Sequence, residues 1–270
     1  MSSFRELLTG EWPMMPSERA ALLGVLAALR PSLSVEIGTY RGGSLDSISA
    51  YSDAVHAFDL RRHEDVTPER FPDVTFHIGD SHELLPRVLE QLAAAGTNVD
   101  FALVDGDHSA TGVRQDVEDL LSSPCAARTV VLLHDTLNER VRAGLEQVDY
   151  AAFGTVSFVD LDFVAGRVMR HGPQADELWY GLGLVVTGWD FERDEWPEAY
   201  GAPEVYDAFA ATRAAGDESR RPGYGQLLEL EHELEVQKEL RRLMERSLSW
   251  RVTAPLRSAR GLLRRARPSR

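Results

Sequence analysis

The stretch VDFALVDGDHSATGVRQDVEDLLSS, residues 99–123, joins an apolar run, a polar turn and an amphipathic segment. Its first part, residues 99–107, predicts a strand that ends in acidic residues. Its last part, residues 111–123, has the spacing of apolar residues that is typical of a helix packed on a core. A strand followed directly by a helix is the repeating unit of a parallel sheet. The stretch therefore predicts an α/β fold.

The same alternation continues on both sides of this stretch. Further strands are expected at 33–39, 54–60, 74–80 and 127–135, and further helices at 17–30 and 81–96. Apolar strands separated by helices indicate a doubly wound sheet, which is covered on both faces. Two later runs, residues 154–162 and 177–189, have no long helix between them. We expect them to form an antiparallel pair that closes the sheet.

The chain divides into one main domain and a C-terminal appendage. We expect the domain to span residues 1–190, because the strand pattern ends there and 270 residues are enough for one full core. Residues 191–224 are rich in Pro, Gly, Asp and Ala and predict a linker. Residues 225–270 predict an amphipathic helix followed by a basic tail, since an apolar stripe precedes a run of arginines.

Charge is distributed unevenly along the chain. The formal net charge is −14, but residues 241–270 carry ten arginines and one glutamate. The acidic remainder argues against nucleic acid as a partner. The basic tail is compatible with contact to an anionic membrane surface or to an acidic partner, and equally with a solvated end of the chain.

Cysteine content and apolar runs indicate the compartment. Cys125 is the only cysteine, so no disulfide can form within the chain and a reducing environment is expected. The first residues lack the apolar core of a signal peptide, and the longest apolar run, residues 20–29, is too short to span a bilayer. We therefore expect a cytoplasmic protein, with peripheral attachment to the inner face of the membrane through the tail as an open alternative.

Polar residues follow the predicted strands at their carboxyl ends, where parallel α/β sheets bind ligands. The first strand runs into VEIGTYRGGS, residues 35–44. Glycines here let the backbone approach a ligand closely, and the helix that follows offers free N–H groups. A tight turn alone would also explain these glycines.

Acidic residues end the next two strands. Asp59 lies about twenty residues after the glycine turn, where a carboxylate can accept hydrogen bonds from both hydroxyls of a ribose. Asp80 and Ser81 are placed to bind the edge of an adenine. Each of these residues is also a common helix cap, but their joint occurrence favours a nucleoside site.

Together these motifs resemble the class I S-adenosylmethionine-dependent methyltransferases. The similarity rests on E-x-G-x-x-x-G-G-S, the strand-end acid, G-D-S, V-D-G-D-H-S and L-L-H-D-T, and covers about residues 15–190. The bacterial branch of small-molecule and sugar O-methyltransferases is the most similar. The resemblance implies a Rossmann-like, seven-stranded sheet with an antiparallel last strand, and S-adenosylmethionine as cofactor. It assigns cofactor binding to Glu36, Gly38, Thr39, Tyr40, Gly42, Ser44, Asp59, Asp80, Ser81 and Asp105.

Metal-dependent relatives hold a divalent ion between the Asp that ends this central strand and an Asp that ends the next. By position these are Asp105 and Asp135, and oxygen ligands suit Mg²⁺. Relatives follow the second Asp with Asn or Asp, whereas Thr136 stands here. His134 is therefore a candidate third ligand, with water or the absence of a metal as alternatives. A mixed histidine and carboxylate site would also suit Fe²⁺.

Two residues are candidates for the catalytic general base. Asp107 matches the Asp-Gly-Asp arrangement of sugar methyltransferases, and we favour it. His108 lies nearer the position of the lysine base in catechol O-methyltransferases, and histidine titrates close to neutral pH.

The expected reaction is methylation of a hydroxyl of a sugar, a glycosylated metabolite or a surface-polysaccharide precursor. The tail SLSWRVTAPLRSARGLLRRAR, residues 247–267, is similar to the ends of bacterial glycosyltransferases and methyltransferases that act on surface polysaccharides. An iron-dependent hydroxylase is the alternative enzyme, because cephalosporin hydroxylase-like sequences resemble this region too. A non-catalytic assembly protein at a membrane is the alternative outside enzymes. Formation of a homo-oligomer is left open.

Overall fold

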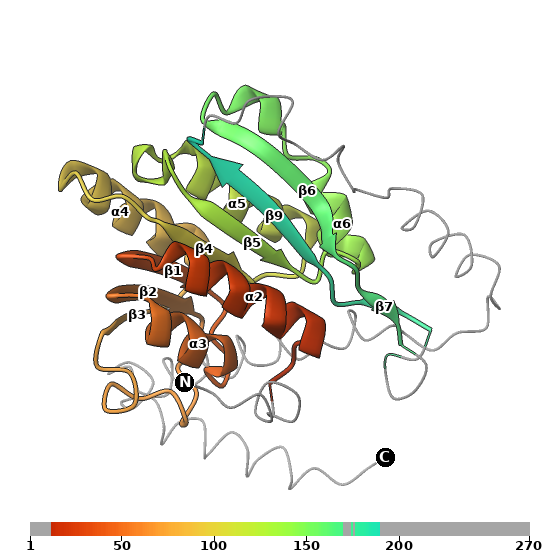
Figure 1. Ribbon diagram of the computed structural model, residues 1–270, viewed down its shortest axis with the longest axis horizontal. Coiled ribbons are helices and arrows are strands. Elements are labelled where there is room, and N and C mark those ends of the chain that lie inside the picture. Colours follow the sequence, from red (N-terminus) through yellow and green to blue (C-terminus); the bar gives the residue numbers. More distant parts are fainter. Residues whose placement is uncertain (1–11, 170–173, 175, 190–270) are drawn as a thin grey trace, which may run out of the picture. The chain divides into compact units, whose positions relative to one another are not determined.

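The computed structural model describes residues 12–169, 174 and 176–189. A seven-stranded sheet with the order β3-β2-β1-β4-β5-β9-β6 forms the centre of this part (Figure 1). Strands β1 to β5 run parallel, and β9 is antiparallel to both of its neighbours, β5 and β6. The predicted doubly wound sheet with an antiparallel last strand is confirmed.

The parallel strands occupy the positions expected from the apolar runs. They are β1 (Leu33–Ile37), β2 (Ala54–Asp59), β3 (Val74–Ile78), β4 (Phe101–Val104) and β5 (Val130–His134). Each is shorter than its predicted range. The polar residues after β4, for example, leave the ladder and form the loop that carries the candidate site.

Helices cover both faces of the sheet, α2 (Pro16–Leu29) and α3 (Gly43–Tyr51) on one, α4 (Ser81–Ala94), α5 (Ala110–Ser122) and α6 (Glu139–Leu145) on the other (Figure 1). Alternate side chains of β4 enter the two layers, as the two-residue period of a strand requires. Phe101 and Leu103 lie in the cluster with α2 and α3, whereas Ala102 and Val104 lie in the cluster with the other three helices.

The antiparallel strands that close the sheet are β6 (Val156–Val164) and β9 (Leu182–Thr187). The run 177–189, predicted as one strand, is divided, because β8 (Leu178–Trp179) pairs with β7 (Arg167–Val168) in a separate two-stranded sheet. The division falls where Tyr180 and Gly181 both adopt left-handed backbone, with φ of 66° and 96°. The prediction of a single strand here is wrong. Short 3₁₀ turns at Pro124–Ala126 and Tyr150–Ala152 precede β5 and β6.

The order of the strands reverses between β1 and β4. The chain leaves β1 for β2 and β3 on one side, and then returns to β4 on the other side of β1. Open α/β sheets bind ligands outside the carboxyl ends of the strands at such a point. Here the loop after β4 contacts the end of β1, since the N–H of Asp105 donates to the carbonyl of Ile37 at 2.8 Å.

The linker predicted at 191–224 and the helix and tail predicted at 225–270 lie outside the described residues. No helix among the described residues is long and apolar enough to cross a membrane.

Candidate functional site

The turn after β1 brings two backbones into close contact. Gly38 has a φ of +88°, and a Cβ atom placed on it would lie 2.1 Å from the carbonyl oxygen of Asp105. Gly42, also left-handed with a φ of 80°, is the N-cap of α3. Only glycine fits the first position, because any side chain there would collide with the loop after β4. The turn therefore fixes Asp105 beside the N-terminus of α3.

A small pocket lies over this turn. It is lined by Trp12, Pro13, Met14, Gly38, Thr39, Tyr40, Gly43, Ser44 and Asp105, and its volume is about 20 Å³. That volume suffices for a water molecule, which needs about 10–15 Å³. Trp12 rests on Gly43, and the Arg19 guanidinium lies over the Trp12 ring at 5.2 Å. A larger ligand would require the segment 12–14 to shift.

Glu36, predicted to bind the cofactor, is buried inside β1. The hydroxyl of Ser44 donates to its Oε1, and its Oε2 has no hydrogen-bond partner among the described residues. Burial raises the pKa of Glu36 to about 8, and the nearby carboxylates of Asp105 and Asp59 add to the effect. The side chain is therefore mostly protonated at neutral pH.

Asp59 holds the glycine turn from the neighbouring strand. Its Oδ2 accepts from the N–H of Thr39 at 3.0 Å, from the Thr39 hydroxyl at 3.0 Å and from the N–H of Tyr40 at 2.9 Å. Its Oδ1 accepts from the N–H of Arg61 at 3.1 Å. The carboxylate predicted to bind a ribose thus also anchors the turn, a role that the sequence did not reveal.

Asp80 and Ser81 both take part in local structure at the start of α4. Asp80 is the N-cap, and its Oδ1 accepts from the N–H of His82 at 3.0 Å. The Ser81 hydroxyl donates to Oδ1 of the buried Asp116 at 2.9 Å. The capping role weighed above is therefore present, and adenine binding by these residues stays a prediction.

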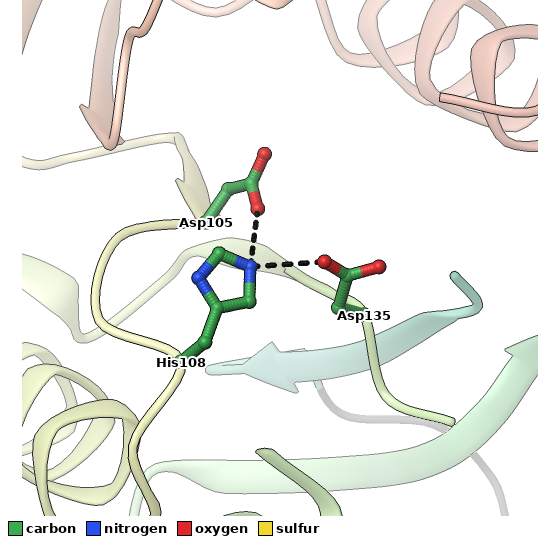
Figure 2. A group of neighbouring side chains, drawn as sticks. All are labelled: Asp105, His108 and Asp135. Carbon is green, nitrogen blue, oxygen red and sulfur yellow. Dashed lines mark hydrogen bonds and ion pairs between the residues drawn. The ribbon is translucent and has the colours of Figure 1, made fainter. Parts of the chain in front are cut away.

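Asp105, His108 and Asp135 converge at the carboxyl ends of β4 and β5, as Figure 2 shows. Nε2 of His108 lies 2.9 Å from Oδ2 of Asp135 and 3.6 Å from Oδ1 of Asp105. One ligand atom from each residue lies within 4.8 Å of the others, which is close enough for a shared metal ion. Asp135 has a left-handed φ of 55°, and its Oδ1 accepts from the N–H of Tyr180 at 2.9 Å. The break between β8 and β9 thus holds Asp135 in place.

His134, the predicted third ligand, lies behind the two carboxylates. Its Nδ1 is 2.9 Å from Oδ1 of Asp105 and 3.6 Å from Oδ2 of Asp135. Its Nε2 is 3.6 Å from Oε1 of Glu18, a fully buried residue of α2. No sequence motif pointed to Glu18, which is distant from this group in the chain. From the sequence, a glutamate in the first turn of a helix indicates only a favourable charge at the helix N-terminus.

The carboxylates of this group raise the pKa of both histidines. Burial opposes a charge on the His134 ring, but Asp105, Asp135 and Glu18 outweigh it and hold the pKa of His134 well above its usual value. Burial likewise opposes a charge on His108, and the contact with Asp135 outweighs it, so the pKa of His108 is raised. The carboxylates of this group therefore favour the charged form of both imidazoles.

Asp107 points to a different set of partners. Its Oδ1 accepts from the N–H of Ser109 at 2.7 Å, and its Oδ2 lies 3.7 Å from Nε2 of His82. Contact with the fully buried Asp116, at 3.2 Å from Nδ1, raises the pKa of His82 to about 9. Among the described contacts, none joins Asp107 to Asp135. The structure therefore brings His108, and not Asp107, into the group with Asp105 and Asp135.

Comparison with known proteins gives one sequence match. Residues 35–136 match a family model described as a methyltransferase domain. No curated protein matches the chain.

Several solved structures align with this chain at low sequence identity. An O-methyltransferase from Bacillus cereus in complex with SAH is 16% identical, with a TM-score of 0.48 over 68% of this chain and 90% of that one. The O-methyltransferase TomG from Streptomyces achromogenes, in complex with SAM, is 15% identical, with a TM-score of 0.47 over 68% and 86%. The N-methyltransferase NodS from Bradyrhizobium japonicum is 15% identical, with a TM-score of 0.43 over 68% and 96%. The match to the methyltransferase-domain model, over residues 35–136, includes the glycine turn, Asp105, His108 and Asp135.

Proposed function

We propose that the protein is an S-adenosylmethionine-dependent O-methyltransferase. The observation that carries this proposal is the position of Asp105, which lines the pocket over the glycine turn and also contacts His108. A methyl donor held by the turn and an acceptor hydroxyl held near His108 would meet at Asp105. The family match over residues 35–136 supports the reaction type.

Three neighbouring strand ends offer groups for the donor. The Gly38 turn and the N-terminus of α3 suit the amino-acid end, and Asp59 suits the ribose hydroxyls. Leu60 directly follows Asp59, and Ile78 lies two residues before Asp80. Both side chains are apolar, yet Leu60 is 50% exposed and Ile78 is 48% exposed. A nucleobase against them would remove this apolar surface from water.

In the reaction, the acceptor oxygen bonds to the methyl carbon while the carbon–sulfur bond breaks and the sulfonium becomes a neutral thioether. The hydroxyl loses its proton, and we assign this proton to the imidazole of His108. We prefer His108 to Asp107 because His108 contacts both Asp105 and Asp135. Because the pKa of His108 is raised, the ring has to lose its own proton before it can accept this one, so the reaction should become faster as the pH rises.

Mg²⁺ fits this group less well than the sequence suggested. Mg²⁺ prefers a shell of oxygen ligands, whereas the three residues with neighbouring ligand atoms include the imidazole of His108. Each carboxylate also lies 2.9 Å from a histidine nitrogen. We therefore assign no step to Mg²⁺.

The same donor set favours a second candidate, the iron-dependent hydroxylase. Mixed histidine and carboxylate ligands suit Fe²⁺, and such an enzyme would use His108 as a metal ligand instead of a base. It predicts Fe²⁺ binding that His108→Asn abolishes, without binding of S-adenosylmethionine.

For the acceptor, we propose a hydroxyl of a sugar, a glycosylated metabolite or a surface-polysaccharide precursor, on the strength of the sequence resemblance. Peripheral membrane contact through the tail and formation of a homo-oligomer stay predictions.

Calorimetric titration of S-adenosylmethionine and S-adenosylhomocysteine into the purified protein tests the donor site. We expect micromolar binding of both, and a loss of about tenfold or more in Asp59→Ala, because this change removes the anchor of the turn and the ribose partner. Asp53→Ala, at the exposed opposite end of β2, is the matched control and should bind normally. Absence of binding by the unmodified protein would refute the proposal, and Fe²⁺ binding in its place would support the hydroxylase.

A further inference from the structure

Glu18 is a fully buried carboxylate that contacts three separate segments. Its Oε1 accepts from the N–H of Gly181 at 2.6 Å and lies 3.6 Å from Nε2 of His134. Its Oε2 accepts from the N–H of Met15, directly after the pocket-lining segment 12–14. Glu18 therefore contacts the residue that follows the pocket-lining segment 12–14, the turn between β8 and β9, and His134, which lies behind Asp105.

His134 transmits the position of Glu18 to the pocket. Its side chain is 4% exposed, and its ring lies between Glu18 on one side and Asp105 on the other. Nδ1 of the ring is 2.9 Å from Oδ1 of Asp105, and Asp105 lines the pocket. The ring has a carboxylate beside each nitrogen, at 2.9 Å from Nδ1 and 3.6 Å from Nε2, and these contacts restrain the ring and with it the Asp105 carboxylate.

A purely structural role does not require a negative charge at this position. Burying a carboxylate is costly, and apolar residues of similar volume often replace buried ion pairs without loss of stability. Besides the N–H groups of Gly181 and Met15, the Glu18 carboxylate faces His134, the side chain that separates it from Asp105. This arrangement indicates a role in the site.

We propose that Glu18 is a positioning residue of the methyl-donor site, which acts through His134 to hold the Asp105 carboxylate towards the sulfonium of S-adenosylmethionine. The proposal rests on the proposed function. Asp105 attracts the positive sulfonium, and S-adenosylhomocysteine lacks that charge. Correct placement of Asp105 should therefore favour S-adenosylmethionine over S-adenosylhomocysteine, whereas a general loosening of the fold would weaken both equally.

The test is the ratio of the two dissociation constants, measured by calorimetry on the full chain. The variants are Glu18→Gln, His134→Asn, the double variant and Asp105→Asn. Glu118→Gln, which removes a carboxylate of α5 that pairs with Arg114 at 2.6 Å, is the control. Thermal unfolding of each variant verifies that it is folded, and His134→Asn keeps the test informative if Glu18→Gln fails to fold.

We expect Glu18→Gln and His134→Asn each to lower the preference for S-adenosylmethionine by about tenfold, as for other residues that support a site from behind. The double variant should lose no more of this preference than either single variant, because both substitutions interrupt the same chain of contacts. Glu118→Gln should keep the preference. An unchanged preference in Glu18→Gln, or additive losses in the double variant, overturns the proposal even if both ligands bind. Failure of the unmodified protein to bind either ligand overturns the proposed function itself.

Discussion

Replacing Gly38 with alanine should destabilise the domain by about 2–5 kcal/mol. Two costs add. The φ of +88° is unfavourable for any residue with a Cβ atom, which costs about 1–2 kcal/mol. The new Cβ would also lie 2.1 Å from the carbonyl oxygen of Asp105, so the loop after β4 has to move, at a further cost of about 1–3 kcal/mol. Urea unfolding measures the loss, and the same shift should displace Asp105 and weaken binding of the methyl donor.

Two other glycines separate these costs. Gly24 lies within α2 and a Cβ there has no neighbour within 4 Å, so Gly24→Ala should stabilise the helix by up to about 1 kcal/mol. Gly96 has a φ of +66° and equally open surroundings, so Gly96→Ala measures the backbone cost alone. If Gly38→Ala proves no worse than Gly96→Ala, the loops after β1 and β4 do not meet as described.

The fold was predictable because its signals are local. Each parallel strand is a short apolar run, and each is followed by residues that leave the ladder. The break between β8 and β9 was not predictable, because it lies at Tyr180, a left-handed residue whose N–H donates to Asp135, 45 positions earlier. A contact of that kind has no signature in the local sequence.

The candidate site was predictable in part. The motif positions correctly place Asp105 and Asp135 at neighbouring strand ends, and the structure adds His108 to them. Which of Asp107 and His108 faces Asp135 depends on how the loop after β4 turns, and the alternation of a strand does not extend into a loop. Glu18 was not predictable for another reason. Its partners Gly181 and His134 lie on distant segments, and only the tertiary fold brings them together. The roles of the predicted cofactor residues stay predictions.

Glu36 makes the stability of the domain depend on pH. Its carboxyl group is buried in β1, and burial raises its pKa from 4.5 to about 8. Below pH 4.5 the group is protonated in both the folded and the unfolded chain, so it carries no cost. As the pH rises towards 8, the unfolded chain releases this proton while the folded chain retains it, and the free energy of unfolding falls. A change from 4.5 to about 8 corresponds to a loss of the order of 4–5 kcal/mol above pH 8.

Glu36→Gln should remove this dependence. Glutamine keeps an acceptor for the Ser44 hydroxyl and carries no charge, so at pH 5 the variant should unfold at nearly the same urea concentration as the unmodified protein. At pH 9 it should be the more stable of the two by several kcal/mol, because only the unmodified protein then buries a carboxylate. His82, with a pKa raised to about 9 chiefly by Asp116, loses its own contribution over a similar range in both proteins, so the difference between them isolates Glu36. Glu90→Gln, an exposed change on α4, is the control and should leave the pH profile as it is. Parallel pH profiles for Glu36→Gln and the unmodified protein would show that Glu36 is ionised in the folded state at neutral pH.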